Sequence, residues 1–323
     1  MSSEYLESEI FCMGTNIIQR VYGSNARKTI KKVENEMKRL EASMNFYKAS
    51  SEIGILNNCG FQKKVKLSRD VFKIIKKAKY FSEISQGAFD ISLAPVIELW
   101  GVFTKHERVP LEKEIKETLS LVNYNNLILD ESENTVKFYK ENMQIDLGGI
   151  AKGYAADIAI KIYKQNNIRA AFINLGGNVM VFGEKPDNSN WSIGVQEPFK
   201  SRGDIIGVVN VSNKSVVTSG NYVRYFEDKG VKYHHIIDPR TGYPADSNLM
   251  SVTVISQNSM EGDALSTAAF VLGDKEGMQF IKNYGAKAIF ITKDKKVKIT
   301  SNMRQDFYLI EDSGFEYCSE DVL

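Results

Sequence analysis

The chain has 323 residues, and its 42 basic and 40 acidic side chains give a formal net charge of +2. This near balance gives no electrostatic reason to expect nucleic acid or a membrane surface as the partner. Hydrophobic residues make up 43% and charged residues 25% of the chain, which is typical of a globular protein that buries a sizeable core.

Residues 1–18 lack the basic start and apolar core of a secretory signal peptide. The chain contains no run of about 18 apolar residues, so we expect no transmembrane span. Its three cysteines, Cys12, Cys59 and Cys318, show no metal-ligand spacing, and we expect free thiols. These features predict a cytoplasmic protein, although an exported chain trimmed of its leader would have the same features.

The N-terminal part predicts two amphipathic helices. Over residues 25–44, apolar side chains recur at steps of three and four from Ala26 to Met44. The same spacing continues from Val71 to Phe81, where Ser68 is placed to cap a second helix. The charged stretch 104–118 is interpreted as a surface excursion.

The C-terminal part predicts antiparallel hairpins. Two apolar runs within 169–183 flank Gly176, Gly177 and Asn178, and residues 288–300 form a second pair of runs around Lys293–Lys296. Residues 251–256 alternate like a strand. Helices interspersed with hairpins predict an α+β fold with a largely antiparallel sheet and flanking helices. Since no linker is evident, we expect one domain over 1–323, with room for two intertwined subdomains.

The stretch "GDALSTAAFVLG" (262–273) predicts the start of a helix. Asp263 and Thr267 stand four residues apart, so a carboxylate and a hydroxyl project from one helix face. These hard oxygen donors suit Mg²⁺, which takes few protein ligands. Alternatively, Asp263 only complements the helix dipole while Thr267 packs inward.

The stretch "IDLGGIAKGYAADIA" (145–159) places three glycines where a strand is expected to enter a helix. A helix N-terminus attracts phosphate, but the glycine spacing matches neither a P-loop nor a dinucleotide fingerprint. A turn without a ligand is equally compatible. Asp157, one turn into the expected helix, is a hydrogen-bond acceptor for a ligand or a plain surface carboxylate.

Two further side chains are candidates for chemistry. Asp90 is a lone acid in the apolar stretch 85–101, where it binds a polar group or caps the following helix. His235, in "HHIIDPRTGYP" (234–244), is the candidate general base, because histidine titrates near neutral pH. In an extended segment His234 would point the other way, and a structural role for either ring stays open.

In combination and in this order, the motifs resemble the ApbE family, whose members are flavin transferases. The resemblance runs from about residue 12 to residue 300. The motifs that carry it include "GAFDISLAP", "IDLGGIAKGYAAD", "NLGGN", "TSGNYVRYF", "HHIIDPRTG" and "GDALSTAAFVLG". It implies an ApbE-like fold related to the T-fold.

The resemblance also implies roles for individual residues. It assigns Mg²⁺ binding to the Ala151 carbonyl, Asp263 and Thr267, and catalysis to His235. It assigns FAD binding to a larger set: Met13, Tyr47, Ala88, Phe89, Asp90, Asp157 and Ile237.

The implied reaction is Mg²⁺-dependent transfer of FMN from FAD to a Thr or Ser hydroxyl of an acceptor flavoprotein, with release of AMP. Family acceptors are redox-complex subunits or flavin-dependent reductases with a motif resembling Asp-Gly-x-Ser/Ala-Thr. Two alternatives remain, a Mg²⁺-dependent FAD pyrophosphatase that releases FMN and AMP, and a non-catalytic FAD-binding protein. A carrier needs neither a metal nor a base, so His235 and Asp263 favour an enzyme.

Overall fold

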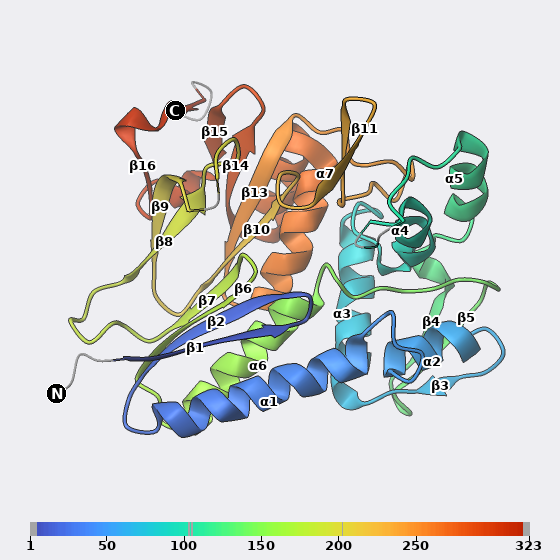
Figure 1. The fold of residues 1–323 in the computed structure, drawn as a ribbon, viewed down its shortest axis with the longest axis horizontal. Helices are drawn as coiled ribbons and strands as arrows, with labels where there is room; N and C mark the ends of the chain where they lie inside the picture. The colour runs from blue at the N-terminus through green and yellow to red at the C-terminus, as the bar shows by residue number, and fades with distance from the viewer. Residues whose placement is uncertain (1–4, 103, 105, 202, 319–323) are drawn as a thin grey trace. The chain divides into compact units, whose positions relative to one another are not determined.

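The structure is a computed structural model that describes residues 5–102, 104, 106–201 and 203–318. Its contacts divide into two compact units, each assembled from separate segments (Figure 1). Unit 1 comprises Met1–Leu40, Lys152–Gly220 and Asn248–Leu323, and unit 2 comprises Glu41–Ala151 and Asn221–Ser247. The predicted α+β class with a largely antiparallel sheet is confirmed.

Unit 1 is built on one nine-stranded sheet. All neighbouring strands in it are antiparallel except the last pair. In spatial order the strands are β1 (Tyr5–Cys12), β2 (Thr15–Tyr22), β6 (Ala170–Leu175), β7 (Asn178–Phe182), β10 (Ser215–Gly220), β13 (Leu249–Ser256), β14 (Lys287–Thr292), β15 (Lys296–Ile299) and β17 (Glu316–Tyr317).

Both predicted hairpins of this sheet are confirmed. β6 and β7 join through Gly176 and Gly177, whose φ angles of +64° and +101° suit glycine. Asn178 pairs with Leu175, so it is the first strand residue and lies just outside the turn. β14 and β15 form the second hairpin.

Helices cover one face of the sheet in unit 1. α7 (Ser259–Tyr284) packs along β10, β13 and β14, as Figure 1 shows. α6 (Ala151–Gln165) reaches β2, where the Tyr163 hydroxyl donates to Gln19 Oε1 at 2.9 Å. α1 (Ala26–Met44) confirms the first predicted helix, and Ile30, Val33 and Met37 form its buried stripe.

A smaller sheet covers the other face. It consists of β8 (Trp191–Gln196), β9 (Ile205–Val211) and β16 (Phe307–Leu309). The short 3-10 helix η4 (Glu311–Ser313) follows β16 in the chain. Its apolar side chains share one core with those of β7, β10, β13, β14 and β15, and the 3-10 helix η3 (Ser301–Met303) adds to it. The central sheet is therefore buried on both faces, which explains why β14 is almost continuously apolar.

Unit 2 is mostly helical. Its helices are α2 (Glu52–Cys59), α3 (Arg69–Ile84), α4 (Ala94–Trp100) and α5 (Glu112–Leu119), with 3-10 helices η1 (Ile91–Leu93) and η2 (Tyr124–Asn126). Its strands form a sheet of β3 (Val65–Lys66), β5 (Thr135–Phe138) and β4 (Leu127–Asp130), and a hairpin of β11 (Tyr225–Asp228) and β12 (Val231–His234). α3 is the second predicted helix, and Ser68 caps it as expected.

One local prediction for unit 2 is incomplete and another is wrong. The stretch 104–118 is more than a surface excursion, because it enters α5 and buries Ile115 against Trp100 and Ile237; Lys105 lies outside the described residues. Residues 145–147 are not a strand. The side chain of Asn57 forms hydrogen bonds with both the N–H and the C=O of Ile145, so these groups need no partner strand.

Within the residues that the structure describes, none of the helices has both the length and the apolar character required to cross a bilayer.

α6 and α7 cross closely at Gly153. A Cβ atom there would press against the Ser259 carbonyl oxygen and lie 2.6 Å from the Met260 Cα. We therefore expect Gly153→Ala to lower the free energy of unfolding by about 1–3 kcal/mol through overpacking. Helix propensity alone would make the alanine variant more stable by about 1 kcal/mol. A measured loss of stability would therefore report the steric contact between residue 153 and α7.

Chemical denaturation of Gly153→Ala beside the exposed Lys161→Ala, on the same helix, measures this effect. Lys161→Ala should change the unfolding free energy by less than about 0.5 kcal/mol. Equal stability of the two variants would contradict the close crossing.

Candidate functional site

Asp263 is a buried carboxyl group at the crossing of α6 and α7. The residue is 5% exposed, and Oδ2 accepts the backbone N–H of Gly153 at 2.9 Å. The sequence had predicted that Asp263 lies at the start of the helix. α7 begins at Ser259, however, so Asp263 lies in its second turn. The carboxyl group thus faces the first turn of α6, whose N–H groups lack partners within their own helix.

Burial raises the pKa of the Asp263 carboxyl group. The charge of Lys152 opposes this effect, as do the hydrogen bond from the Gly153 N–H and the nearby side chain of Asn178. A further cation beside the carboxyl group would favour its ionised form.

Thr267 shares a helix face with Asp263, as predicted, and belongs to a cluster of hydroxyl groups. The hydroxyl groups of Thr267 and Ser266 both donate to the Asp263 carbonyl oxygen, at 3.2 and 3.1 Å. Ser219 Oγ, on β10, lies 3.2 Å from Thr267 Oγ1 and 2.9 Å from Ser266 Oγ. Because the Thr267 proton is directed to a carbonyl, the lone pairs of its oxygen are available as acceptors.

Asp157 caps the beginning of α7. Its Oδ1 accepts the Ser259 N–H at 2.7 Å and its Oδ2 accepts the Met260 N–H at 3.0 Å. This cap explains why α7 starts three residues earlier than the sequence predicted. Asp157 also lines a cavity of about 300 Å³ together with Lys161 and Lys164.

Asp157 and Asp263 therefore cap each other's helix. Asp157 of α6 holds the first turn of α7, and Asp263 of α7 holds the first turn of α6. Negative charge at a helix N-terminus is favourable, so each carboxylate also complements a helix dipole. An FAD contact by Asp157 stays a prediction beside this structural role.

The two adjacent histidines have different partners, as an extended segment requires. His235 Nδ1 lies 3.1 Å from the Arg224 carbonyl oxygen, whereas His234 Nε2 lies 3.1 Å from the Ala245 carbonyl oxygen. A carbonyl oxygen only accepts, so Nδ1 of His235 carries the proton. In that tautomer Nε2 carries the lone pair that a general base uses.

The turn after His235 is fixed on the core of unit 2. Gly242, at φ +76°, closes the turn, and its carbonyl accepts the Trp100 indole N–H at 2.8 Å. Asp238 Oδ1 accepts the Arg240 backbone N–H, and the Arg240 guanidinium pairs with the same carboxylate. The Ile237 side chain is buried against Trp100, so only its backbone can face a ligand.

Asp90 caps the 3-10 helix η1, which is one of the two roles that the sequence left open. Its Oδ1 accepts the Ser92 N–H at 2.8 Å, and Oδ2 accepts the Tyr124 N–H at 3.0 Å. Burial raises the pKa of the Asp90 carboxyl group, and these hydrogen bonds oppose the shift. The Ala88 and Phe89 side chains are buried, so they offer a ligand only their backbone.

The three remaining predicted residues lie at turns or helix starts. Met13, at φ +54°, and Gly14 form the two-residue turn between β1 and β2, a conformation that methionine rarely adopts. Tyr47 is 64% exposed, and its ring packs edge-on against Phe46. Ala151 is the first residue of α6.

Sequence reasoning missed Asn178 and Ser219 as neighbours of the predicted metal ligands. Both come from strands that are distant in sequence from Asp263. Their motifs, "NLGGN" and "TSGNYVRYF", were the signals that could have directed attention to them.

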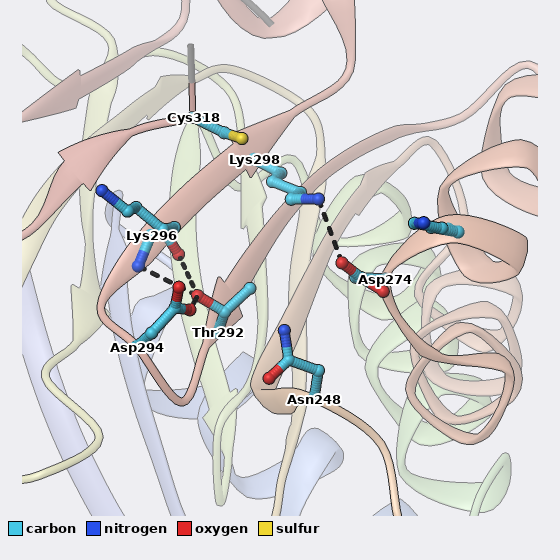
Figure 2. Close-up of a pocket in the computed structure, with 8 residues that line it drawn as sticks. Asn248, Asp274, Thr292, Asp294, Lys296, Lys298 and Cys318 are labelled. Carbon is cyan, nitrogen blue, oxygen red and sulfur yellow. Dashed lines mark hydrogen bonds and ion pairs between the residues drawn. The ribbon is translucent and has the colours of Figure 1, made fainter. Parts of the chain in front are cut away.

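A second cavity, of about 280 Å³, lies in unit 1 around the β14–β15 hairpin (Figure 2). It contains none of the predicted site residues. Two of its three lysines are in ion pairs, Lys298 with Asp274 at 3.0 Å and Lys296 with Glu316. We assign this cavity no ligand.

Among the described residues, no three His, Cys, Asp or Glu side chains are arranged to hold a metal ion. The predicted magnesium set is of another kind, with one carboxylate, one hydroxyl and one carbonyl. Mg²⁺ keeps much of its shell for water and phosphate, so such a sparse set is compatible with it.

The chain is similar to known proteins over nearly its whole length. The ApbE family model matches residues 13–290. A relative from Klebsiella pneumoniae (strain 342), named FAD:protein FMN transferase, is 37% identical over 305 residues, 94% of each chain. A relative of the same name from Treponema pallidum (strain Nichols) is 31% identical over 318 residues, 93% of this chain and 88% of that one.

Solved structures agree with the sequence matches. The crystal structure of the ApbE protein from Thermotoga maritima has a TM-score of 0.87 at 35% identity, covering 94% of this chain and 99% of that one. The apo form of the Pseudomonas stutzeri flavinyl transferase ApbE has a TM-score of 0.80 at 27% identity, covering 90% and 92%. The resemblance predicted from the motifs is confirmed, and the chain belongs to the ApbE family.

Proposed function

We propose that this chain transfers the FMN half of FAD to a hydroxyl group of an acceptor protein and releases AMP. The relatives named FAD:protein FMN transferase support this activity, because one of them matches 94% of the chain at 37% identity. The structural observation that carries the proposal is that the buried carboxyl group of Asp263 and the hydroxyl oxygen of Thr267 share one helix face. A protein that only stores flavin has no use for such a pair.

The proposed metal ligands are the Ala151 carbonyl, Asp263 and Thr267. Hard oxygen donors match Mg²⁺, and the buried Asp263 carboxyl group gains from a cation beside it. Thr267 directs its proton to the Asp263 carbonyl and keeps its oxygen lone pairs for a cation. When bound, Mg²⁺ would neutralise the charge that grows on phosphate oxygens as a P–O bond breaks.

His235 is the proposed general base. Its Nε2 would take the proton of an acceptor Thr or Ser hydroxyl, whose oxygen then attacks the FMN-side phosphorus of FAD. A new P–O ester bond forms, the bond from that phosphorus to the bridging oxygen breaks, and AMP leaves. The Arg224 carbonyl fixes the ring in the required tautomer.

The predicted FAD contacts are kept as part of this proposal. Met13 and Tyr47 would contribute side chains, and Ala88, Phe89 and Ile237 would contribute backbone because their side chains are buried. The capping carboxylates Asp90 and Asp157 would add acceptor sites, since an ionised carboxylate has about four lone-pair positions.

A transfer assay tests the proposed function. The protein is incubated with FAD, Mg²⁺ and a peptide that lacks serine and contains Asp-Gly-x-Ala-Thr, one form of the acceptor motif expected from the family. We expect the peptide to gain one FMN by mass spectrometry, with one AMP released per FMN attached. A matched peptide with Val in place of Thr is the control and should stay unmodified.

The same assay separates the alternatives. Free FMN and AMP formed equally with and without peptide would identify a pyrophosphatase. Bound FAD without any AMP release would identify a binding protein. Either result would contradict the transferase.

Replacing the proposed base should stop chemistry without removing FAD. We expect His235→Asn to lower the transfer rate by about 10²–10⁴-fold, because the acceptor hydroxyl loses its proton acceptor. The FAD dissociation constant should stay within a few-fold of the unmodified value. His234→Asn is the matched control, since that ring contacts the Ala245 carbonyl and has no proposed role in proton transfer. Near-normal transfer by His235→Asn would eliminate it as the base.

Removing the metal should also stop transfer. EDTA is expected to abolish FMN transfer, and added Mg²⁺ should restore it, because the phosphate charge is otherwise not neutralised. In Asp263→Asn the same addition should restore little activity, since the only carboxylate of the set is lost. Transfer that persists in EDTA would contradict the metal role.

A further inference from the structure

Asn178 is a buried polar residue beside the first turn of α7. The residue is 2% exposed, and the Ser259 hydroxyl donates to its Oδ1. Ser259 is itself fixed, because its backbone N–H donates to Asp157 Oδ1. Because Oδ1 accepts the hydrogen bond from Ser259, the orientation of the amide plane is fixed and Nδ2 points away from that hydroxyl group.

The remaining amide group lies next to Asp263. Ser259 and Asp263 stand four residues apart on α7, so they share the helix face that Asn178 contacts. Asn178 is also close enough to lower the pKa of the Asp263 carboxyl group. Yet within the described part of the chain Nδ2 completes no hydrogen bond of good geometry.

A buried amide donor without a completed hydrogen bond is costly, by about 1–3 kcal/mol. The neighbouring group that can satisfy it is the ionised carboxylate of Asp263, which is an acceptor only. Gly153 already donates to Oδ2 of that carboxylate. Asn178, which lies near the same carboxyl group, is the second donor available to it.

We propose that Asn178 is a positioning residue, whose Nδ2 group and the Gly153 N–H together hold the Asp263 carboxylate in the orientation that takes a divalent cation. This role rests on the proposed metal function of Asp263. Groups that orient a metal ligand in this way typically contribute about 10–100-fold to metal affinity. Ser259 secures the amide, so it contributes indirectly.

The test measures metal affinity directly and does not depend on turnover. Mn²⁺, which prefers the same oxygen ligands as Mg²⁺, is titrated into the full chain, and free Mn²⁺ is followed by electron paramagnetic resonance. We expect Asn178→Ala to raise the Mn²⁺ dissociation constant at least about tenfold. Transfer assays should show a matching rise in the Mg²⁺ concentration for half-maximal rate, with kcat recovered at high Mg²⁺.

Asn174→Ala is the matched control. Asn174 belongs to the same β6–β7 hairpin, but its Oδ1 accepts the Gly177 N–H of the turn. It should leave the Mn²⁺ dissociation constant unchanged even if it destabilises the hairpin. Should Asn178→Ala not fold, Ser259→Ala frees the amide with a smaller change in volume, and it too should weaken Mn²⁺ binding several-fold.

Asp263→Asn separates the two possible failures. If it binds Mn²⁺ as the unmodified chain does, the metal role of Asp263 is wrong and Asn178 has nothing to position. If Asp263→Asn loses Mn²⁺ while Asn178→Ala binds it normally, only the positioning role is overturned.

Discussion

The reciprocal capping of α6 and α7 is the interaction on which the candidate site depends. The first N–H groups of each helix have no partner within that helix, and each helix receives a carboxylate from the other, Asp157 for α7 and Asp263 for α6. Both carboxylates complement a helix dipole, so the exchange favours the close, fixed crossing. Gly153 permits it, because a Cβ there would collide with the first turn of α7.

This crossing places a polar cluster within a largely apolar core. Burial raises the pKa of the Asp263 carboxyl group, so its ionised form must be supported by donors and cations around it. Gly153, Asn178 and Lys152 supply that support from two other elements of unit 1. The same arrangement caps a helix and would hold the carboxylate ready for the proposed cation, so a structural role and the proposed functional role are compatible in one residue.

The sequence predicted what depends on local spacing. The apolar period of α1, the Ser68 cap of α3 and the glycine turn between β6 and β7 are each contained in fewer than about twenty residues, a range over which periodicity is informative. It failed where a distant group decides the outcome. α7 starts at Ser259 because Asp157, from another helix, caps it, and Ile145 is not in a strand because the Asn57 side chain takes its backbone groups. Asn178 and Ser219 were missed for the same reason.

The paired histidines illustrate both kinds of information in one place. The alternation of side chains along an extended segment is a local property, and it correctly predicted that the two rings point in different directions. The tautomer of His235, however, is set by the carbonyl of Arg224, which strand pairing between β11 and β12 brings opposite it, with Tyr225 paired to His234. Because the contact is to backbone, the ring orientation depends on the register of that hairpin and on the turn that Gly242 and Trp100 anchor. Loosening the turn would therefore disorder the proposed base even though no catalytic atom is removed.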